Sequence, residues 1–141
     1  MQKPVIQEET TGCGIASVAN ILGKTYTEIK TAANSIGIYA EDKSLWSDKQ
    51  YFRRMLSNSG VETSAEEYPF ESWSALPDLA LLSINYHQEE EKNFWHWVVF
   101  KREDGQSFVM DSASYLPSNI RKDFNTIHPK WFIEVKNYST I

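Results

Sequence analysis

Apolar residues recur at helical spacing in the first part of the chain. From Cys13 to Leu22 they return every three or four positions, and Gly23 follows, which predicts a helix over these ten residues. Thr25 and Glu28 form a capping-box pattern. A second helix is therefore expected to begin there and to end before Gly37, because glycine commonly terminates helices.

A third helix is expected in the middle of the chain. Ser47 and Gln50 form another capping-box pattern, and Trp46 with Tyr51 fits a hydrophobic staple at a helix start. The apolar residues that follow keep the helical spacing, and Gly60 is expected to mark the end.

The second half of the chain has the pattern of a sheet. LALLSINY, from Leu79 to Tyr86, is apolar enough for a buried strand. WHWVVFK and QSFVMDS flank the pair Asp104-Gly105, which is a strong signal for a β-hairpin. WFIEVK, from Trp131 to Lys136, predicts a final strand. Helices followed by antiparallel strands predict an α+β fold, with the N-terminal helices packed on a C-terminal antiparallel sheet.

Composition narrows the functional classes. We expect a single domain over the 141 residues, without repeats or linkers. The net charge of -5 and the absence of a dense basic patch argue against nucleic-acid binding, since Arg121-Lys122 is too short a cluster. There is no apolar run of about 18 residues for a membrane span, and the start has no signal-peptide pattern. With one cysteine, a reducing compartment, the cytoplasm, is expected. The oligomeric state is not indicated.

Cys13 is a candidate nucleophile. It lies between Gly12 and Gly14 where loop becomes helix, and the positive end of a helix dipole favours the anionic, reactive form of sulfur. The two glycines are expected to leave the backbone open to an approaching carbonyl group. The alternative, that this lone cysteine is a small buried hydrophobic residue, stays open at this point.

His96 and Asp111 are expected to meet across the predicted hairpin. If Asp104-Gly105 forms a two-residue turn, Val98 faces Asp111, and His96 is a diagonal neighbour of Asp111 on the same face of the sheet. Their β-carbons would then lie roughly 7 Å apart. A carboxylate in this position can fix the tautomer of an imidazole. The alternative is an ordinary core histidine beside a turn aspartate.

The other two histidines are weaker candidates for a functional role. His87 precedes the acidic run Gln88-Glu89-Glu90-Glu91, which predicts a solvated loop, and His128 before Pro129 is typical of a turn. The histidines, the cysteine and the carboxylates show no zinc-binding spacing, so we expect neither a metal nor a cofactor.

The segment QEETTGCGIASVANIL resembles the N-terminal motif of the papain-like peptidases that process double-glycine leader peptides. In that family a glutamine stands six positions before the nucleophilic cysteine, and Cys-Gly-x-Ala opens the central helix; Gln7, Cys13, Gly14 and Ala16 match. LPDLALLSINY and HWVVFKREDGQSFVMD follow in the order of the family's later motifs. The likeness covers most of the chain and is strongest around Cys13 and His96.

The resemblance implies a papain-like fold and a role for each matching residue. Cys13 would be the nucleophile, His96 the general base and acid, and Asp111 the residue that orients the imidazole. Gln7 would donate its side-chain amide to the oxyanion hole, beside the backbone N–H of Cys13. The chain departs from the family at Ser112, where proline is usual, and in the acidic insertion HQEEEKN. It also lacks the membrane helices and ATPase to which the better-known members are fused.

Three functions are compatible with this sequence. The first is a cysteine hydrolase, a peptidase or related amidase, that acts on a peptide or protein through a thioacyl-enzyme. The second is a deamidase or an acyltransferase, because the same intermediate supports glutamine deamidation or acyl transfer to an acceptor other than water. The third is a catalytically silent module that binds peptides and keeps the fold.

Overall fold

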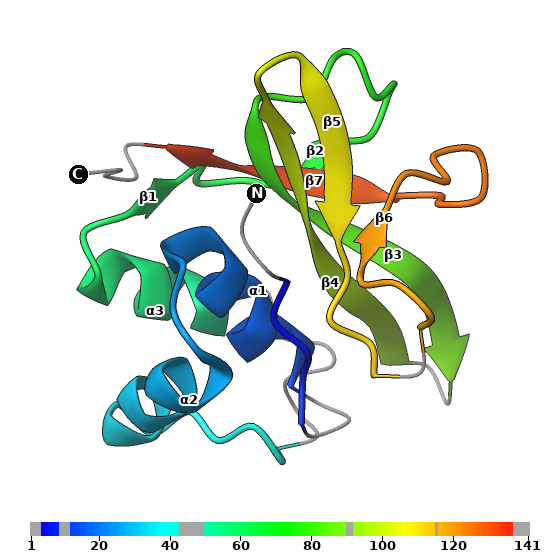
Figure 1. Ribbon diagram of the computed structural model, residues 1–141. Helices are drawn as coiled ribbons and strands as arrows, with labels where there is room; N and C mark the ends of the chain where they lie inside the picture. The colour runs from blue at the N-terminus through cyan, green and yellow to red at the C-terminus, as the bar shows by residue number, and fades with distance from the viewer. Residues whose placement is uncertain (1–3, 9–11, 43–49, 90–91, 115, 137–141) are drawn as a thin grey trace.

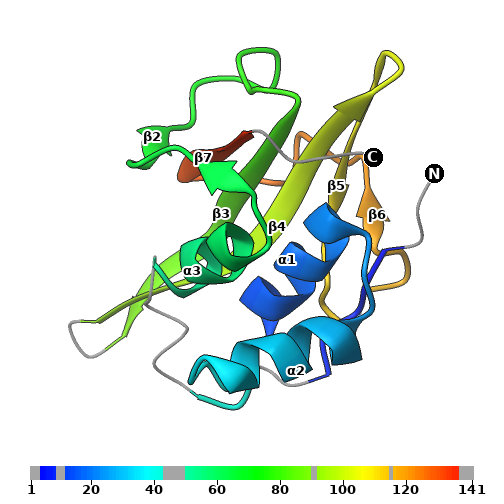
Figure 2. The ribbon, with the colours of Figure 1, turned by 90° about the vertical axis from the view of Figure 1, so that its left-hand side faces the viewer.

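The computed structural model describes residues 4–8, 12–42, 50–89, 92–114 and 116–136, and of residues 86–89 and 92–94 it describes the backbone alone. Three helices lie together on one side of a curved sheet (Figures 1 and 2). This arrangement confirms the α+β fold expected from the sequence. The helices are α1 (Cys13–Leu22), α2 (Tyr26–Ser35) and α3 (Tyr51–Asn58). The strands are β1 (Glu62–Thr63), β2 (Tyr68–Pro69), β3 (Leu79–Glu89), β4 (Lys92–Glu103), β5 (Gln106–Met110), β6 (Ile120–Arg121) and β7 (Trp131–Lys136).

The helix predictions hold with one difference in a boundary. Thr25 caps α2 through its side chain, which accepts a hydrogen bond from the Glu28 N–H. The Glu28 carboxylate in turn accepts from the Thr25 N–H. The capping box is therefore confirmed. Helix α3 begins at Tyr51 with Gln50 as its N-cap residue, later than a Ser47 cap predicts. Ser47 and Trp46 lie outside the described residues.

All strand pairs in the described residues are antiparallel, in the order β1-β7-β3-β4-β5-β6, with β2 also paired to β7. The turn between β4 and β5 has positive φ at both central residues, 52° at Asp104 and 77° at Gly105, which is the backbone of a type I′ turn. The resulting register runs from Glu103 opposite Gln106 to Val99 opposite Met110, as the two-residue turn predicts.

The expectation of a solvated loop over the acidic run is wrong at Gln88 and Glu89, and residues 90 and 91 lie outside the described residues. Strands β3 and β4 continue as a hairpin ladder, in which His87 pairs with Phe94 and Glu89 with Lys92, after a register shift that follows Ile84. Acidic composition suggested a loop because charged residues are rare in buried strands. A hairpin that extends beyond the core does not need apolar side chains, since its backbone hydrogen bonds are satisfied between its own strands.

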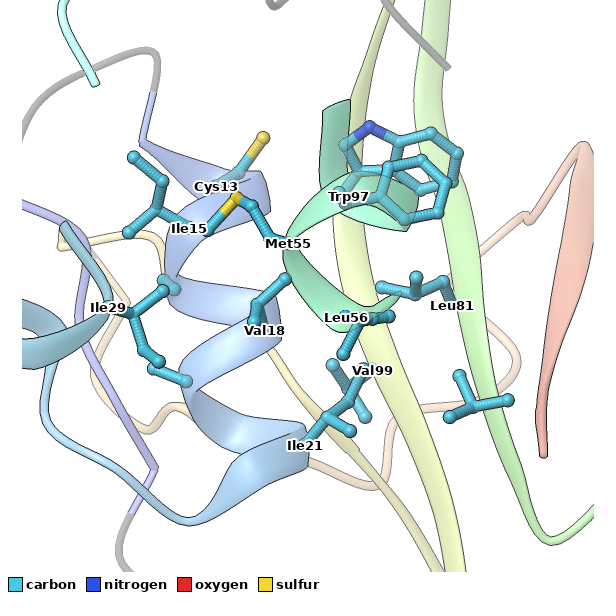
Figure 3. Packing of buried hydrophobic residues seen from close by; sticks show 14 of the residues in the cluster. Cys13, Ile15, Val18, Ile21, Ile29, Met55, Leu56, Leu81, Trp97 and Val99 are labelled. Carbon is cyan, nitrogen blue, oxygen red and sulfur yellow. The ribbon is translucent and has the colours of Figure 1, made fainter. Parts of the chain in front are cut away.

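The sheet is buried on both faces. Between sheet and helices, Trp95, Trp97 and Val99 of β4 pack against residues of α1 and α3, including Val18, Ile21 and Leu56 (Figure 3). On the other face, Val98 and Phe100 belong to a second apolar cluster. Its buried members are Leu76, Ala80, Leu82, Ile84, Val98, Phe100, Val109 and Ile127. Strand β4 therefore alternates between two cores, which fixes its register.

Helix α1 is tied to β4 near the end of the β4–β5 ladder. The Ser17 Oγ donates to the backbone carbonyl of Trp97 at 3.3 Å, and both groups are buried. Residues four apart lie on the same side of a helix. Cys13 lies one turn before Ser17, and His96 directly precedes Trp97 on β4. The apolar face of α1 and this hydrogen bond together place the helix start beside the histidine.

Gly14 has a different role from the one its position suggested. A β-carbon at Gly14 would overlap the hydroxyl group and ring of Tyr51, the first residue of α3. Gly14 is buried, so it does not provide an open approach to the neighbouring sulfur. The missing side chain instead allows α3 to pack closely against the first turn of α1.

We therefore expect Gly14→Ala to destabilise the protein. Alanine favours a helix over glycine by about 1 kcal/mol, but overpacking a filled core costs about 1–3 kcal/mol. Urea unfolding should show a net loss, whereas Thr31→Ala, at an exposed position of α2, should be neutral or stabilising. A Gly14→Ala protein as stable as the wild type would contradict the close packing on Tyr51.

Candidate active site

Cys13 is the first residue of α1, and Gly12 precedes it as an N-cap residue without a side-chain cap. The first N–H groups of a helix have no partner within the helix, so polar chemistry is available at this end. Cys13 is only 3% exposed. Figure 3 shows it at the start of the helix, with the sulfur directed away from the aliphatic side chains of Val18 and Ile21.

His96 and Asp111 form the contact predicted from the hairpin. The His96 Nε2 and the Asp111 Oδ1 lie 2.7 Å apart, a short hydrogen bond typical of a charged pair. His96 is carried by β4, and Asp111 follows the last residue of β5. The imidazole side chain is 17% exposed and the carboxylate 3%, so one edge of the ring remains open to solvent.

The charge state of His96 depends on both of its neighbours. Burial of the ring, the largest effect, lowers its pKa, but hydrogen bonds to Asp111 and to the Cys13 side chain, together with the charges of both groups, raise the pKa from 6.5 to about 10. Because Nε2 bonds to Asp111, Nδ1 is the nitrogen left for the sulfur. The structure thus brings Cys13, His96 and Asp111 together: His96 is hydrogen-bonded to Asp111, and Cys13 lies close enough to the ring to affect its pKa.

The Asp111 carboxylate has several other donors. Its Oδ1 also accepts from the Ala113 N–H at 3.1 Å, and its Oδ2 accepts from the Arg121 Nη1 at 3.0 Å. Burial, the largest effect, raises the pKa of Asp111. The hydrogen bond and charge of His96, the Ala113 N–H and Arg121 outweigh burial and leave the pKa below its usual value.

Arg121 and Asn119 belong to this site, and the sequence did not indicate them. Arg121 bridges two carboxylates, because it also makes a two-pronged contact with Asp123 at 3.1 and 2.7 Å. The Asn119 Nδ2 donates to the carbonyls of Asp111 and Ala113 at 2.7 and 2.9 Å, and its own carbonyl accepts from the Asp111 N–H at 2.9 Å. Asn119 therefore fixes the backbone around Asp111.

Gln7 lies beside the residue that follows Asp111. Its backbone N–H donates to the Ser112 carbonyl at 2.9 Å. Its side-chain Oε1 accepts from the Ser112 Oγ at 2.7 Å. Of the four residues predicted from the sequence, three are joined through their side chains. The fourth, Gln7, is anchored to the adjacent position of the same segment.

The burial of Cys13 bears on both interpretations of this residue. Low exposure is typical of a structural cysteine. The position of Cys13 beside the imidazole, where it helps to raise the pKa of His96, is in contrast typical of a cysteine paired with a base. Its low exposure shows that only a small part of Cys13 reaches the surface.

Metal-binding clusters and membrane-spanning helices are both absent from the described residues. No group of three or more histidine, cysteine, aspartate or glutamate side chains in the described ranges is arranged to hold a metal ion. The helices within those ranges are also too short or too polar to serve as membrane-spanning segments.

Comparison with known proteins supports the fold. The chain is similar to the crystal structure of a double-glycine motif protease from an AMS/PCAT transporter in complex with its leader peptide. The TM-score is 0.59 at 19% sequence identity, and the match covers 93% of this chain and 88% of the other. The papain-like α+β fold expected from the sequence is thus confirmed. No family model and no curated protein matches the sequence.

The raised pKa of His96 predicts a pH-dependent stability. The folded protein binds this proton more tightly than the unfolded chain, so the stabilisation is complete below about pH 6.5 and is lost as the pH rises through about 10. Urea unfolding of wild-type and His96→Gln proteins should therefore show a difference in free energy that shrinks from pH 6 to pH 10. A difference that stays constant would show that the pKa is not raised.

Proposed function

We propose that this protein is a cysteine hydrolase, a peptidase or related amidase, that acts on a peptide or protein substrate. The observation that carries the proposal is the His96–Asp111 hydrogen bond with Cys13, at the start of α1, beside the imidazole. A nucleophile, a base and a group that orients the base, at these spacings, are the working parts of covalent acyl transfer.

The proposed reaction proceeds by proton transfer among Cys13, His96 and the substrate. The Cys13 proton passes to the imidazole, and the imidazolium is stabilised by the Asp111 carboxylate. The sulfur then attacks the carbonyl carbon, and the C=O π electrons move to oxygen. When the carbonyl re-forms, the C–N bond breaks and the amine leaves with the proton from His96. Water, deprotonated by the same imidazole, hydrolyses the thioester and restores the thiol.

The oxyanion formed in the attack needs hydrogen-bond donors. The backbone N–H of Cys13, at the unpartnered end of α1, is the first of these in our proposal. The side-chain amide of Gln7 is the second. Its oxygen is already occupied by the Ser112 Oγ. This hydrogen bond orients the amide, and in our proposal its NH₂ group donates to the oxyanion.

A peptide is the substrate class that the comparison supports. The similar protease was solved with a leader peptide, and we propose a peptide or protein segment as the substrate here. Deamidation of glutamine and acyl transfer use the same thioacyl-enzyme, so they remain chemical variants of this proposal. They differ in whether ammonia leaves and in which acceptor, water or an amine, takes the acyl group.

The second candidate function is a silent peptide-binding module. The 3% exposure of Cys13 favours it, because a binding surface does not require access to the sulfur. The two functions differ in whether Cys13 is chemically activated by His96.

Alkylation with iodoacetamide tests that activation. We expect wild-type Cys13 to react well below about pH 8.5, the range in which an ordinary thiol ionises. His96→Ala should move the pH profile toward that value, because the imidazolium partner is lost. The rate is measured by intact-mass spectrometry between pH 5 and pH 10.

The matched control is His128→Ala, which removes an exposed histidine and should leave the profile unchanged. A Cys13 that does not react in the folded protein, or a pH profile that is the same in His96→Ala, would contradict the hydrolase and support the silent module.

Gln7→Ala should slow acylation while leaving alkylation intact. Loss of an oxyanion donor raises the barrier by about 2–4 kcal/mol, whereas alkylation by iodoacetamide forms no oxyanion. Acylation is followed as the burst of p-nitrophenol released from p-nitrophenyl acetate. Gln106→Ala, at an exposed position of β5, is the control. An acylation rate unaffected by Gln7→Ala would remove Gln7 from the site.

A further inference from the structure

Ser112 is a buried polar residue directly after Asp111, and it is 1% exposed. Its hydroxyl group donates to the Gln7 Oε1 at 2.7 Å, and its carbonyl accepts from the Gln7 backbone N–H at 2.9 Å. Two hydrogen bonds between residues 105 positions apart, one of them between side chains, hold Gln7 in a single orientation.

We propose that Ser112 is a positioning residue, which holds the amide of Gln7 in place through the Ser112 Oγ–Gln7 Oε1 hydrogen bond. The inference rests on the proposed hydrolase and adds a residue to it. Ser112 does not touch the reacting atoms. It acts by removing the freedom of the Gln7 side chain to rotate, which a donor in an oxyanion hole must not have.

The surroundings of Ser112 explain why it can serve as an anchor. The residues on either side, Asp111 and Ala113, are held by Asn119 through their carbonyl groups. The Asp111 carboxylate is also fixed by Arg121. A hydroxyl group on a backbone held at this many points can restrain its partner without moving itself.

The segment formed by Asp111 and Ser112 orients two functional groups. Asp111 directs His96 through the carboxylate, and Ser112 directs Gln7 through the hydroxyl group. One short segment can therefore hold the base and the oxyanion donor in a constant relation to each other.

A double-mutant cycle on the full-length protein tests the proposal. The variants are Ser112→Ala, Gln7→Ala and the double variant, and the probe is acylation by p-nitrophenyl acetate. We expect Ser112→Ala to slow acylation by about tenfold, the upper end for loss of one hydrogen bond. Iodoacetamide alkylation should change less than about twofold. The double variant should be no slower than Gln7→Ala alone, because the anchor has no function without the amide.

Two further variants separate positioning from general stability. Ser112→Thr keeps a hydroxyl group and should recover most of the acylation rate. Ser64→Ala is the matched control. Ser64 is also buried, and its hydroxyl group donates to the Glu66 carbonyl and accepts from the Glu134 N–H, but it lies beside β7. Ser64→Ala should leave both rates unchanged. Equal losses of acylation and alkylation in Ser112→Ala would show that Ser112 only stabilises the fold.

A structural measurement makes the anchor testable apart from catalysis. The two side-chain N–H signals of Gln7 in ¹⁵N NMR spectra should be shifted in the wild type from the positions of an unrestrained glutamine, and should move toward those positions in Ser112→Ala. Unchanged signals, or additive rate losses in the cycle, overturn the role of Ser112 and leave the hydrolase intact. Wild-type protein that is not acylated at all overturns both.

Discussion

The buried carboxylate of Asp111 is the constraint around which this site is built. An ionised carboxylate that is 3% exposed requires partners, since burial of an unpaired charge costs far more than a folded domain can offset. The protein supplies a cation on each carboxylate oxygen, His96 on one and Arg121 on the other, with a backbone N–H from Ala113. The pairing of β4, β5 and β6 side by side brings these three donors to one point.

The partners of Asp111 also explain how the charges of the site are balanced. From the surface inward, Asp123, Arg121, Asp111 and His96 alternate in sign, and each contacts the next. Arg121 compensates the carboxylate on the side away from the imidazole. The pKa of Asp111 is therefore held below its usual value even though the carboxylate is buried. Arg121 is chemically suited to this because its guanidinium group stays charged and its planar geometry reaches two carboxylates together.

The sequence predicted the parts of the site that depend on local rules. The Asp104-Gly105 turn determined the register of β4 and β5, and the register placed His96 beside Asp111. The helix start at Cys13 followed from apolar spacing. Arg121 and Asn119 could not be found in this way, because a two-residue strand and the loop before it have no periodic pattern. Ser112 could be noted only as an unusual residue. Its bond to Gln7 spans 105 positions and depends on tertiary packing.

The burial of Cys13 is compatible with reactivity when the sulfur and the imidazole are considered as a pair. Transfer of the proton from sulfur to His96 changes a neutral thiol and neutral ring into a thiolate and an imidazolium, so the net charge of the pair is zero in both forms. Burial then acts on a dipole, which it penalises less than an isolated ion. Asp111 stabilises the charged form specifically, because its negative charge faces the imidazolium from the other side. A dry surrounding also strengthens each of these interactions. The same burial that hides the sulfur from solvent therefore strengthens its coupling to the base.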